Sequence, residues 1–366
     1  MDKKFVMGIA AMAALTLVSC SSDDLDSVSD NSSKNEAISF DGYLGRSAVA
    51  VNGTRSSELT IDNLQTEGFG VFGNYSSTDN ETFGFNLFKN QKVTGTTSTG
   101  TEGTNKVTKW TYEGGVKYWP STGHIDFLAY APHDTKYDAD NALKGSKINF
   151  TVENTVTAQK DLLWANAKKQ TIQTIANTEN KVKFHFAHAL SRLGFTVKLK
   201  GESSTDATIM LKKITLAGSA KDSKKEAFYT NGDIDLANGN WDQATLNAKQ
   251  YFDWFSSSHK VTSTSQSNTD LNTDYLFVIP QDFSGADQLY VIVEYTMQYT
   301  DVKDSDGKPV IITNTVSKQL TTDFKQSKAY TINLTIGRPI EFDADVTPWT
   351  KSPDNEITNI PIDSWE

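Results

Sequence analysis

Three carboxylates near the C-terminal end of the sequence come closest to the pattern of a hydrolytic active site. Glu341, Asp343 and Asp345 alternate with apolar residues, so a strand would present all three on one face. Two carboxylates at a suitable separation hydrolyse a glycosidic bond, one as general acid and the other as nucleophile or base. The same alternation is the usual pattern of a half-buried strand with a wet outer face. We therefore predict no catalytic residues, and a carboxylate-dependent glycosidase is the weakest alternative that the sequence leaves open.

Histidines and acidic turns do not form a complete metal site in the sequence. His185 and His188 are three residues apart, so on a strand they point to opposite faces and do not share a metal ion. Residues 304–307 read Asp-Ser-Asp-Gly, which contains calcium ligands, but they lie between two apolar runs and lack a closing glutamate. A hairpin turn explains them better. We predict no bound metal.

The glycines of residues 68–73 match the G-x-G-x-x-G fingerprint of dinucleotide-binding proteins. That site needs a helix directly after the glycines, because the helix N-terminus holds the phosphate. Residues 74–79 are loop-like instead, so we predict no nucleotide and no other cofactor. We interpret the glycines as relief from crowding around a strand whose Phe69 and Val71 face the core.

Four aromatic residues have the chemistry of a sugar-binding platform: Trp110, Tyr118, Trp119 and Trp164. Exposed rings in one plane would stack against a sugar, which would indicate a surface glycan-binding β-sandwich lipoprotein. Buried rings that anchor a sandwich core explain the same residues at least as well. Burial of Trp119 and Trp164 separates these two interpretations.

The single cysteine, Cys20, has the clearest chemistry. Two lysines precede an apolar stretch over residues 5–18, and the stretch runs into Ser19-Cys20, as in the lipobox of a bacterial lipoprotein signal peptide. The stretch is shorter than the roughly 20 apolar residues that span a bilayer. We predict that residues 1–19 are a signal peptide and that acyl chains on Cys20 attach the protein to the membrane. An acylated Cys20 leaves no disulfide and no thiol nucleophile.

The remaining composition is typical of an exported β-protein. Residues 20–36 are rich in Ser, Asn and Asp, which predicts a flexible tether, and acidic residues right after Cys20 resemble a signal for the outer cell surface. The formal net charge is −10 and no basic cluster is visible, so we do not expect nucleic acid as a partner. Thr, Ser, Asn, Gly and aromatic residues are abundant, as in strands joined by turns.

Alternation of apolar and polar residues predicts strands along most of the chain. The clearest runs are residues 69–72, 125–130, 195–199, 209–216, 275–279, 289–299 and 330–336. Turn signals occur at residues 52–53, 231–233, 238–239 and 306–307. Helical periodicity is limited to residues 157–166 and a turn at 187–192. Two Ser/Thr/Gly-rich stretches, residues 94–108 and 256–273, are predicted surface loops.

Many short strands and few helices predict an all-β fold built from antiparallel β-sandwiches. Near residues 191–194 an apolar segment ends and a new predicted strand begins. We therefore expect an N-terminal domain over residues 37–192 and a C-terminal domain over residues 193–349. Residues 350–366 remain as a C-terminal tail.

Short segments spread over nearly the whole chain resemble one family in their order. They are residues 17–20, 38–40, 53–55, 70–72, 90–94, 110–112, 116–120, 125–130, 161–165, 186–193, 330–334 and 346–349. Together they resemble the bacterial fimbrillin family, the subunits of pili made from lipoprotein precursors. The resemblance implies two transthyretin-like β-sandwich domains in tandem and a structural, non-enzymatic protein at the cell surface, in a fimbria that supports adhesion.

The resemblance also implies donor-strand exchange with other pilin subunits. In the family, the first strand of the precursor is removed by an arginine-specific protease, and the strand of a neighbouring subunit fills the groove. Here residues 37–55 would be the removable strand. Arg55 and Arg46 are the two arginines that could end it, and Arg55 is favoured because residues 52–57 read as an exposed loop.

The C-terminal tail is the candidate donor strand that the resemblance implies. Ile357, Ile360, Ile362 and Trp365 are its large apolar residues, and Ile360 and Ile362 share a parity that suits neighbouring pockets. Pro353 and Pro361 each remove a hydrogen-bond donor from the ladder. Whether the subunit belongs to the stalk, the tip or the anchor of the pilus is left open. The resemblance implies that the lipid on Cys20 attaches the precursor to the outer membrane, and that this attachment ends when the protease cuts after the arginine.

Overall fold

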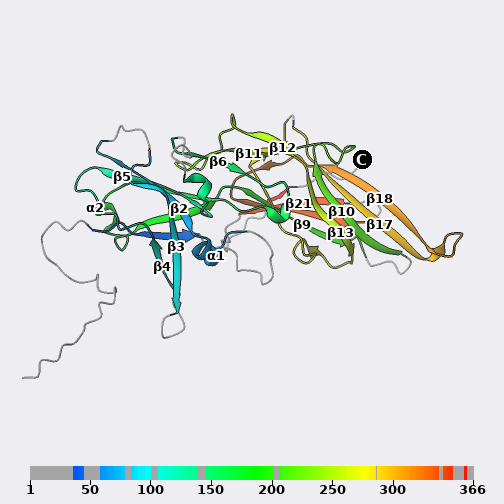
Figure 1. Cartoon of the computed structure of the whole chain (residues 1–366). Coiled ribbons are helices and arrows are strands. Elements are labelled where there is room, and N and C mark those ends of the chain that lie inside the picture. The colour runs from blue at the N-terminus through cyan, green and yellow to red at the C-terminus, as the bar shows by residue number, and fades with distance from the viewer. Residues whose placement is uncertain are drawn as a thin grey trace, which may run out of the picture. The chain divides into compact units, whose positions relative to one another are not determined.

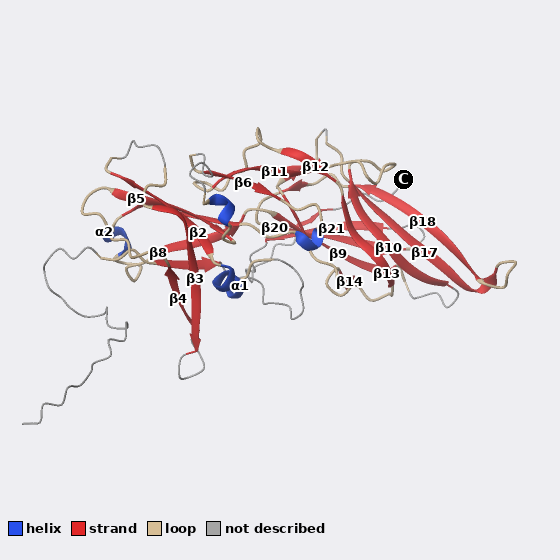
Figure 2. Cartoon of the chain, viewed as in Figure 1, coloured by secondary structure: helices blue, strands red, loops and turns tan. Residues whose placement is uncertain are grey.

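Strands make up most of the structure, a computed structural model that describes residues 36–44, 58–78, 84–99, 106–138, 145–201, 207–285, 287–337, 341–348 and 358–360. The predicted all-β class is confirmed (Figure 2). All seven predicted strand runs contain strands, and the predicted turns at residues 238–239 and 306–307 are present. Within the described residues, no helix is both long enough and apolar enough to cross a membrane.

A seven-stranded sheet contains the first strand of the described chain at one edge (Figure 1). Its strands in spatial order are β1 (Phe40–Leu44), β8 (Val182–His188), β7 (Leu163–Gln170), β5 (His124–Ala131), β2 (Phe69–Ser76), β3 (Phe88–Thr99) and β4 (Lys106–Tyr112). β1 runs parallel to β8, whereas the other neighbours are antiparallel. Joining β1 to a parallel neighbour needs a long connection, which the intervening strands supply.

A four-stranded and a six-stranded sheet pack around a second core. One has the order β13 (Phe252–Lys260), β10 (Ala207–Ala217), β17 (Tyr290–Lys303) and β18 (Pro309–Gln319). The other has the order β14 (Gln266–Ser267), β9 (Ser191–Leu199), β20 (Lys328–Ile336), β21 (Glu341–Pro348) and β22 (Thr358–Ile360), and β15 (Leu276–Val278) also pairs with β9. Their facing side chains, among them Phe195, Trp254 and Ile332, are buried together.

Smaller elements complete the described chain. β12 (Asn247–Gln250), β11 (Phe228–Asp235) and β6 (Lys147–Thr151) form a three-stranded sheet, and β16 (Gln281–Asp282) pairs with β19 (Asp323–Phe324). The helices are α1 (Ile61–Glu67) and α2 (Ile172–Ile175), with 3₁₀ turns η1 (Thr135–Tyr137) and η2 (Val156–Ala158). The division into two domains at residues 192 and 193 stays a prediction, and this point lies inside β9.

The central strands β2 and β5 of the seven-stranded sheet are buried on both faces. Phe69, Val71 and Phe127 face one core together with residues of β1. Phe72, Leu128 and Tyr130 face a different core, which they share with residues of β6, β11 and β15. A strand that is buried on both faces reads as a nearly continuous apolar run, as β2 and β5 do.

Several local predictions are wrong, and their failures share a cause. The predicted helix over 157–166 is the turn η2 followed by β7, and the predicted turn at 187–192 spans the end of β8 and the start of β9. The predicted loop over 94–108 contains parts of β3 and β4, whose β-branched threonines suit an exposed hairpin. Backbone pairing between strands outweighs local composition in each case.

Two further stretches differ from the sequence prediction. Residues 256–273 contain the end of β13 and the short strand β14, so they are only partly loop. Residues 231–233 lie inside β11 and are not a turn. A Cβ atom at Gly232 would lie 2.5 Å from Leu246 Cδ2, so this glycine allows a close approach of two segments.

Candidate functional site: the groove beneath β1

Strand β1 fills the core from the edge of the seven-stranded sheet. Phe40 and Leu44 are buried, as is Ile38 just before the strand, whereas Tyr43 is 51% exposed. Gly42 passes close to the rings of Phe69 and Trp110, since a Cβ atom there would lie 3.1 Å from each. The strand therefore presents one apolar face to the core and one face to solvent.

Phe40 is the central contact of β1. Its ring centroid lies 5.3 Å from that of Phe88, 5.5 Å from that of Phe127 and 5.7 Å from that of Phe184. The first two pairs are edge-to-face, the geometry that aromatic quadrupoles favour. Burying the side chains of Ile38, Phe40 and Leu44 contributes roughly 5–9 kcal/mol at 1.5–3 kcal/mol each. This range is comparable with the whole stability of a typical domain, so β1 does not leave readily while nothing replaces it.

Backbone hydrogen bonds hold the same segment on two sides. Residues 40–44 pair with residues 182–186 of β8. On the opposite side, Ile38 N donates to Lys117 O at 2.7 Å and Trp119 N donates to Glu36 O at 3.0 Å. Removing residues 36–44 would leave β8 as an unpaired edge beside a groove lined by Phe88, Phe127 and Phe184.

Tyr112 joins the two sides of this site. Its hydroxyl donates to Ile38 O at 2.9 Å and accepts from Lys117 N at 3.2 Å. Burial raises the pKa of Tyr112, so the hydroxyl keeps its proton and can donate to the segment that precedes β1.

The chain is anchored again from Glu58 onward. Glu58 forms an ion pair with Arg192, and Leu59 N donates to Asp161 Oδ2 at 3.2 Å. The same carboxylate oxygen lies 2.8 Å from His188 Nδ1, and both side chains are buried. Thr60 then caps α1, whose Leu64 is fully buried. Residues 58–64 are thus attached to the body by contacts that do not involve β1.

These anchoring contacts were not found from the sequence. Glu58 and Arg192 are 134 positions apart, and no periodicity relates them. The signal nearest to them is the pattern Thr60-x-x-Asn63, because Thr is a favoured N-cap residue. That signal would have predicted α1 but not the ion pair.

Most of the residues predicted to act in lipidation, cleavage or strand donation lie outside the described part of the chain. They are Cys20, Arg46, Arg55, Ile357, Ile362 and Trp365. The fourth donor-strand residue, Ile360, lies in β22, where its backbone is opposite Ala344 of β21. The structure places β1 at an edge of the seven-stranded sheet, and the two candidate arginines fall between Leu44 and Glu58 in sequence.

Of the two interpretations of these four aromatic residues, the structure favours packing in the core over an open sugar platform. Trp110 and Trp119 are buried, with Trp119 only 3% exposed, and Trp164 is partly buried. A Cβ atom at Gly239 would lie 2.1 Å from Trp164, so this indole packs closely on the Gly239 backbone. Tyr118 alone is exposed, which leaves no set of coplanar open rings among these four residues.

The remaining sequence patterns lie in the following elements of the structure. His185 is exposed and His188 is buried on β8, and residues 304–307 form the turn between β17 and β18. A Cβ atom at Gly70 would lie 2.4 Å from the Tyr130 ring, so the glycine relieves crowding beside a core strand. Among Glu341, Asp343 and Asp345, the side chain of Asp345 alone is described, and it accepts a hydrogen bond from Asn333 Nδ2 at 2.7 Å. Within the described residues no group of three His, Cys, Asp or Glu side chains could hold a metal ion.

Comparison with known proteins gives a family match over most of the chain. A profile described as fimbrillin-like matches residues 54–349. None of the curated proteins compared with the chain matches it.

One solved structure shows the same fold, and a second also matches the chain. A fimbrial protein from Bacteroides vulgatus has 21% identity and a TM-score of 0.60, and the match covers 86% of this chain and 99% of that one. A candidate cell adhesion protein from Bacteroides uniformis has 16% identity and a TM-score of 0.46, with 86% and 99% of the two chains covered. The first of these comparisons supports the fold.

Proposed function

Because the chain belongs to the fimbrillin-like family, we propose that it is a structural subunit of a cell-surface pilus. The role is non-enzymatic and needs no cofactor. The precursor is exported as a lipoprotein, is cut after an arginine and then assembles with copies of itself or related subunits by donor-strand exchange. The fimbria that results supports adhesion.

The packing of β1 is the observation that carries this proposal. β1 is an edge strand, and together with Ile38 just before it, its Phe40 and Leu44 belong to a core that otherwise consists of residues after Glu58. Loss of such a strand leaves an unpaired backbone edge and an apolar groove, the two features that a strand from another chain recognises. Backbone bonds would supply affinity, and the alternate side chains would set the register.

The position of the two arginines fits removal of β1. Both Arg46 and Arg55 follow the last residue of β1, Leu44, and precede the first anchored residue, Glu58. Cleavage at either one would therefore release β1 while the contacts of residues 58–64 stay in place. Arg55 is the proposed site, and Arg46 is the alternative.

The lipid on Cys20 then has a temporary role. Cys20 precedes both arginines, so cleavage separates the acyl chains from the body of the subunit. Before cleavage the lipid holds the precursor at the outer membrane, because two or three acyl chains make attachment effectively permanent. After cleavage the subunit is held only by its neighbours.

The proposed donor segment is the C-terminal tail. Residues 358–360 pair in antiparallel register with β21 of the same chain, so this part of the tail adopts the extended conformation that donation requires. Ile360 and Ile362 would occupy the pockets that Phe40 and its neighbours leave. Ile357 and Trp365 are the remaining apolar residues of the segment.

Protease treatment of the purified precursor tests the cleavage step. An arginine-specific protease should yield a new N-terminus at Ser56, read by Edman degradation or mass spectrometry. The Arg55→Ala variant should resist this cut, and Arg46→Ala is the matched control. A precursor that still matures to Ser56 without Arg55 would contradict the assignment, and a new N-terminus at Ser47 would move it to Arg46.

A further inference from the structure

A hollow of about 410 Å³ opens beside η1, on the opposite side of β2 and β5 from the β1 core. Buried side chains form its floor: Tyr130, Tyr137, Phe150 and Leu162. Charged side chains surround it, namely Lys92, Lys136, Lys160, Asp134 and Glu153. We call this site the lysine hollow. Its volume lies within the range of about 300–1,000 Å³ that is typical of small-molecule sites.

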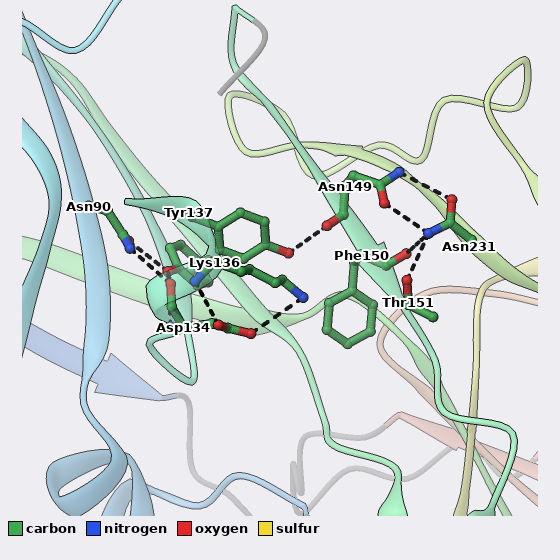
Figure 3. Close-up of polar contacts among 9 residues, drawn as sticks. Asn90, Asp134, Lys136, Tyr137, Asn149, Phe150, Thr151 and Asn231 are labelled. Atoms are coloured by element: carbon green, nitrogen blue, oxygen red, sulfur yellow. Dashed lines mark hydrogen bonds and ion pairs between the residues drawn. The ribbon is translucent and has the colours of Figure 1, made fainter. Parts of the chain in front are cut away.

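The frame of the lysine hollow is fixed by hydrogen bonds. The Tyr130 hydroxyl donates to Asn90 Oδ1 at 2.6 Å, and Asn90 Nδ2 donates to Asp134 O at 2.9 Å. The Tyr137 hydroxyl donates to Asn149 O at 2.6 Å, which joins η1 to β6 (Figure 3). A site whose walls are already ordered loses little conformational entropy when a ligand binds.

Lys136 is held in place on the rim. Its Nζ atom lies 3.4 Å from Asp134 Oδ2, and it lies 4.7 Å from the ring centroid of Tyr137 and 5.4 Å from that of Phe150. Figure 3 shows the lysine side chain running between these two rings. The ammonium group is thus fixed at the mouth of the hollow by one ion pair and two cation–π contacts.

Within the described residues, the other two lysines lack such a partner. Lys92 and Lys160 are exposed, and neither has a carboxylate within 4.0 Å among the residues that the structure describes. They come from separate segments, β3 and the chain after η2. The lining residues thus bring three ammonium groups and two carboxylates together, and a third carboxylate, that of Asp138, accepts from Asn90 Nδ2 of the frame at 2.6 Å.

The mixture of charges restricts the chemistry of a ligand. A carboxylate on the ligand would pair with Lys92 or Lys160, as a charge-assisted hydrogen bond. Asp134 and Glu153 would repel a compact dianion such as phosphate, but they accept hydrogen bonds from hydroxyl groups. The aromatic floor provides apolar contact for C–H groups. A single negative charge, several hydroxyl groups and an apolar face occur together in a sugar acid.

We propose that the lysine hollow binds a monoanionic sugar acid, such as a hexuronate at the end of an acidic polysaccharide. Lys92 and Lys160 bind its carboxylate, and Asp134 and Glu153 accept from its hydroxyl groups. None of the four aromatic residues of the rejected sugar platform lines this site. The site is separate from the β1 groove, so binding does not require cleavage or strand exchange.

Titration with free monosaccharides tests the proposal on the purified full chain. D-Glucuronate and D-galacturonate are the probes, D-galactose is the neutral control and inorganic phosphate is the dianion control. Saturation-transfer NMR and calorimetry should detect millimolar binding of at least one uronate. Lys92→Gln and Lys160→Gln should each weaken it about tenfold, the size of one lost charge-assisted hydrogen bond.

Lys249→Gln is the matched control variant. Lys249 lies outside the hollow, with its Nζ atom 4.4 Å from the Tyr229 centroid and 3.2 Å from Asp287 Oδ2, so its variant removes one lysine charge without changing the site. This variant should bind the uronate as the unchanged protein does. Absence of uronate binding would overturn the proposal, as would equal binding of galactose or phosphate. Unchanged affinity in both Lys92→Gln and Lys160→Gln would also overturn it. Each of these outcomes leaves the pilus proposal untouched, because that proposal rests on β1.

Discussion

Replacing Phe40 by alanine removes the aromatic ring that joins β1 to three other phenylalanines. Phe40 is 2% exposed and its ring lies 5.3–5.7 Å from those of Phe88, Phe127 and Phe184. Truncation of a buried phenylalanine costs about 3–5 kcal/mol, which includes the cavity that it leaves. The free energy of unfolding of the β1-containing unit should fall by that amount.

Urea denaturation of the uncut precursor measures the effect, with tryptophan fluorescence as the readout because Trp110 and Trp119 lie in the same core. Tyr43→Ala is the control on the same strand. Tyr43 is 51% exposed, so this change should cost less than about 1 kcal/mol.

The Phe40→Ala variant also distinguishes the uncut precursor from the trimmed subunit. After protease trimming, Phe40 is no longer part of the subunit, so trimmed Phe40→Ala and trimmed unchanged protein should have equal stability. Equal losses for Phe40→Ala and Tyr43→Ala in the precursor would refute the inference that β1 fills the core. A persisting difference after trimming would refute the inference that β1 is removed.

Three further changes test separate contacts. Tyr112→Phe should weaken β1 docking by about 0.5–1.5 kcal/mol, seen as faster hydrogen exchange at the Ile38 amide. Because burial raises the pKa of Tyr112, the protein should lose stability as the pH rises above about 10, and Tyr112→Phe should lose less over that range. Gly70→Ala should lower the melting temperature, since its Cβ atom meets the Tyr130 ring; an unchanged value would contradict the crowding interpretation. Glu58→Gln should leave β1 docked in the precursor but loosen residues 58–60 after trimming, as measured by limited proteolysis.

Period-two alternation made the core strands predictable. β2 and β5 are buried on both faces, and their apolar runs were recognisable without any knowledge of their partners. The β1 segment was predicted from the resemblance to the fimbrillin family rather than from alternation, because residues 38–40 are one of the resembling segments. For Trp119 the sequence left two outcomes open, exposure in a sugar platform or burial in the core, and the structure shows burial.

The remaining features depend on contacts between distant residues. Residues 157–166 have helical spacing, yet Leu163 and Trp164 pair with His188 and Ala187, and these ladder bonds decide the conformation. The Glu58–Arg192 ion pair and the lysine hollow combine segments far apart in sequence. Lysines 92, 136 and 160 share no motif, so only the fold brings them together.

Assembly of the trimmed subunit tests the central claim most directly. Purified protein cut by the arginine-specific protease should form multimers that survive SDS, whereas the uncut precursor stays monomeric. An excess of a synthetic peptide of residues 36–46 should suppress the multimers by refilling the groove, and the same peptide with Phe40 replaced by alanine should do so poorly. Multimers that form without trimming, or that the peptide leaves unchanged, would contradict the account.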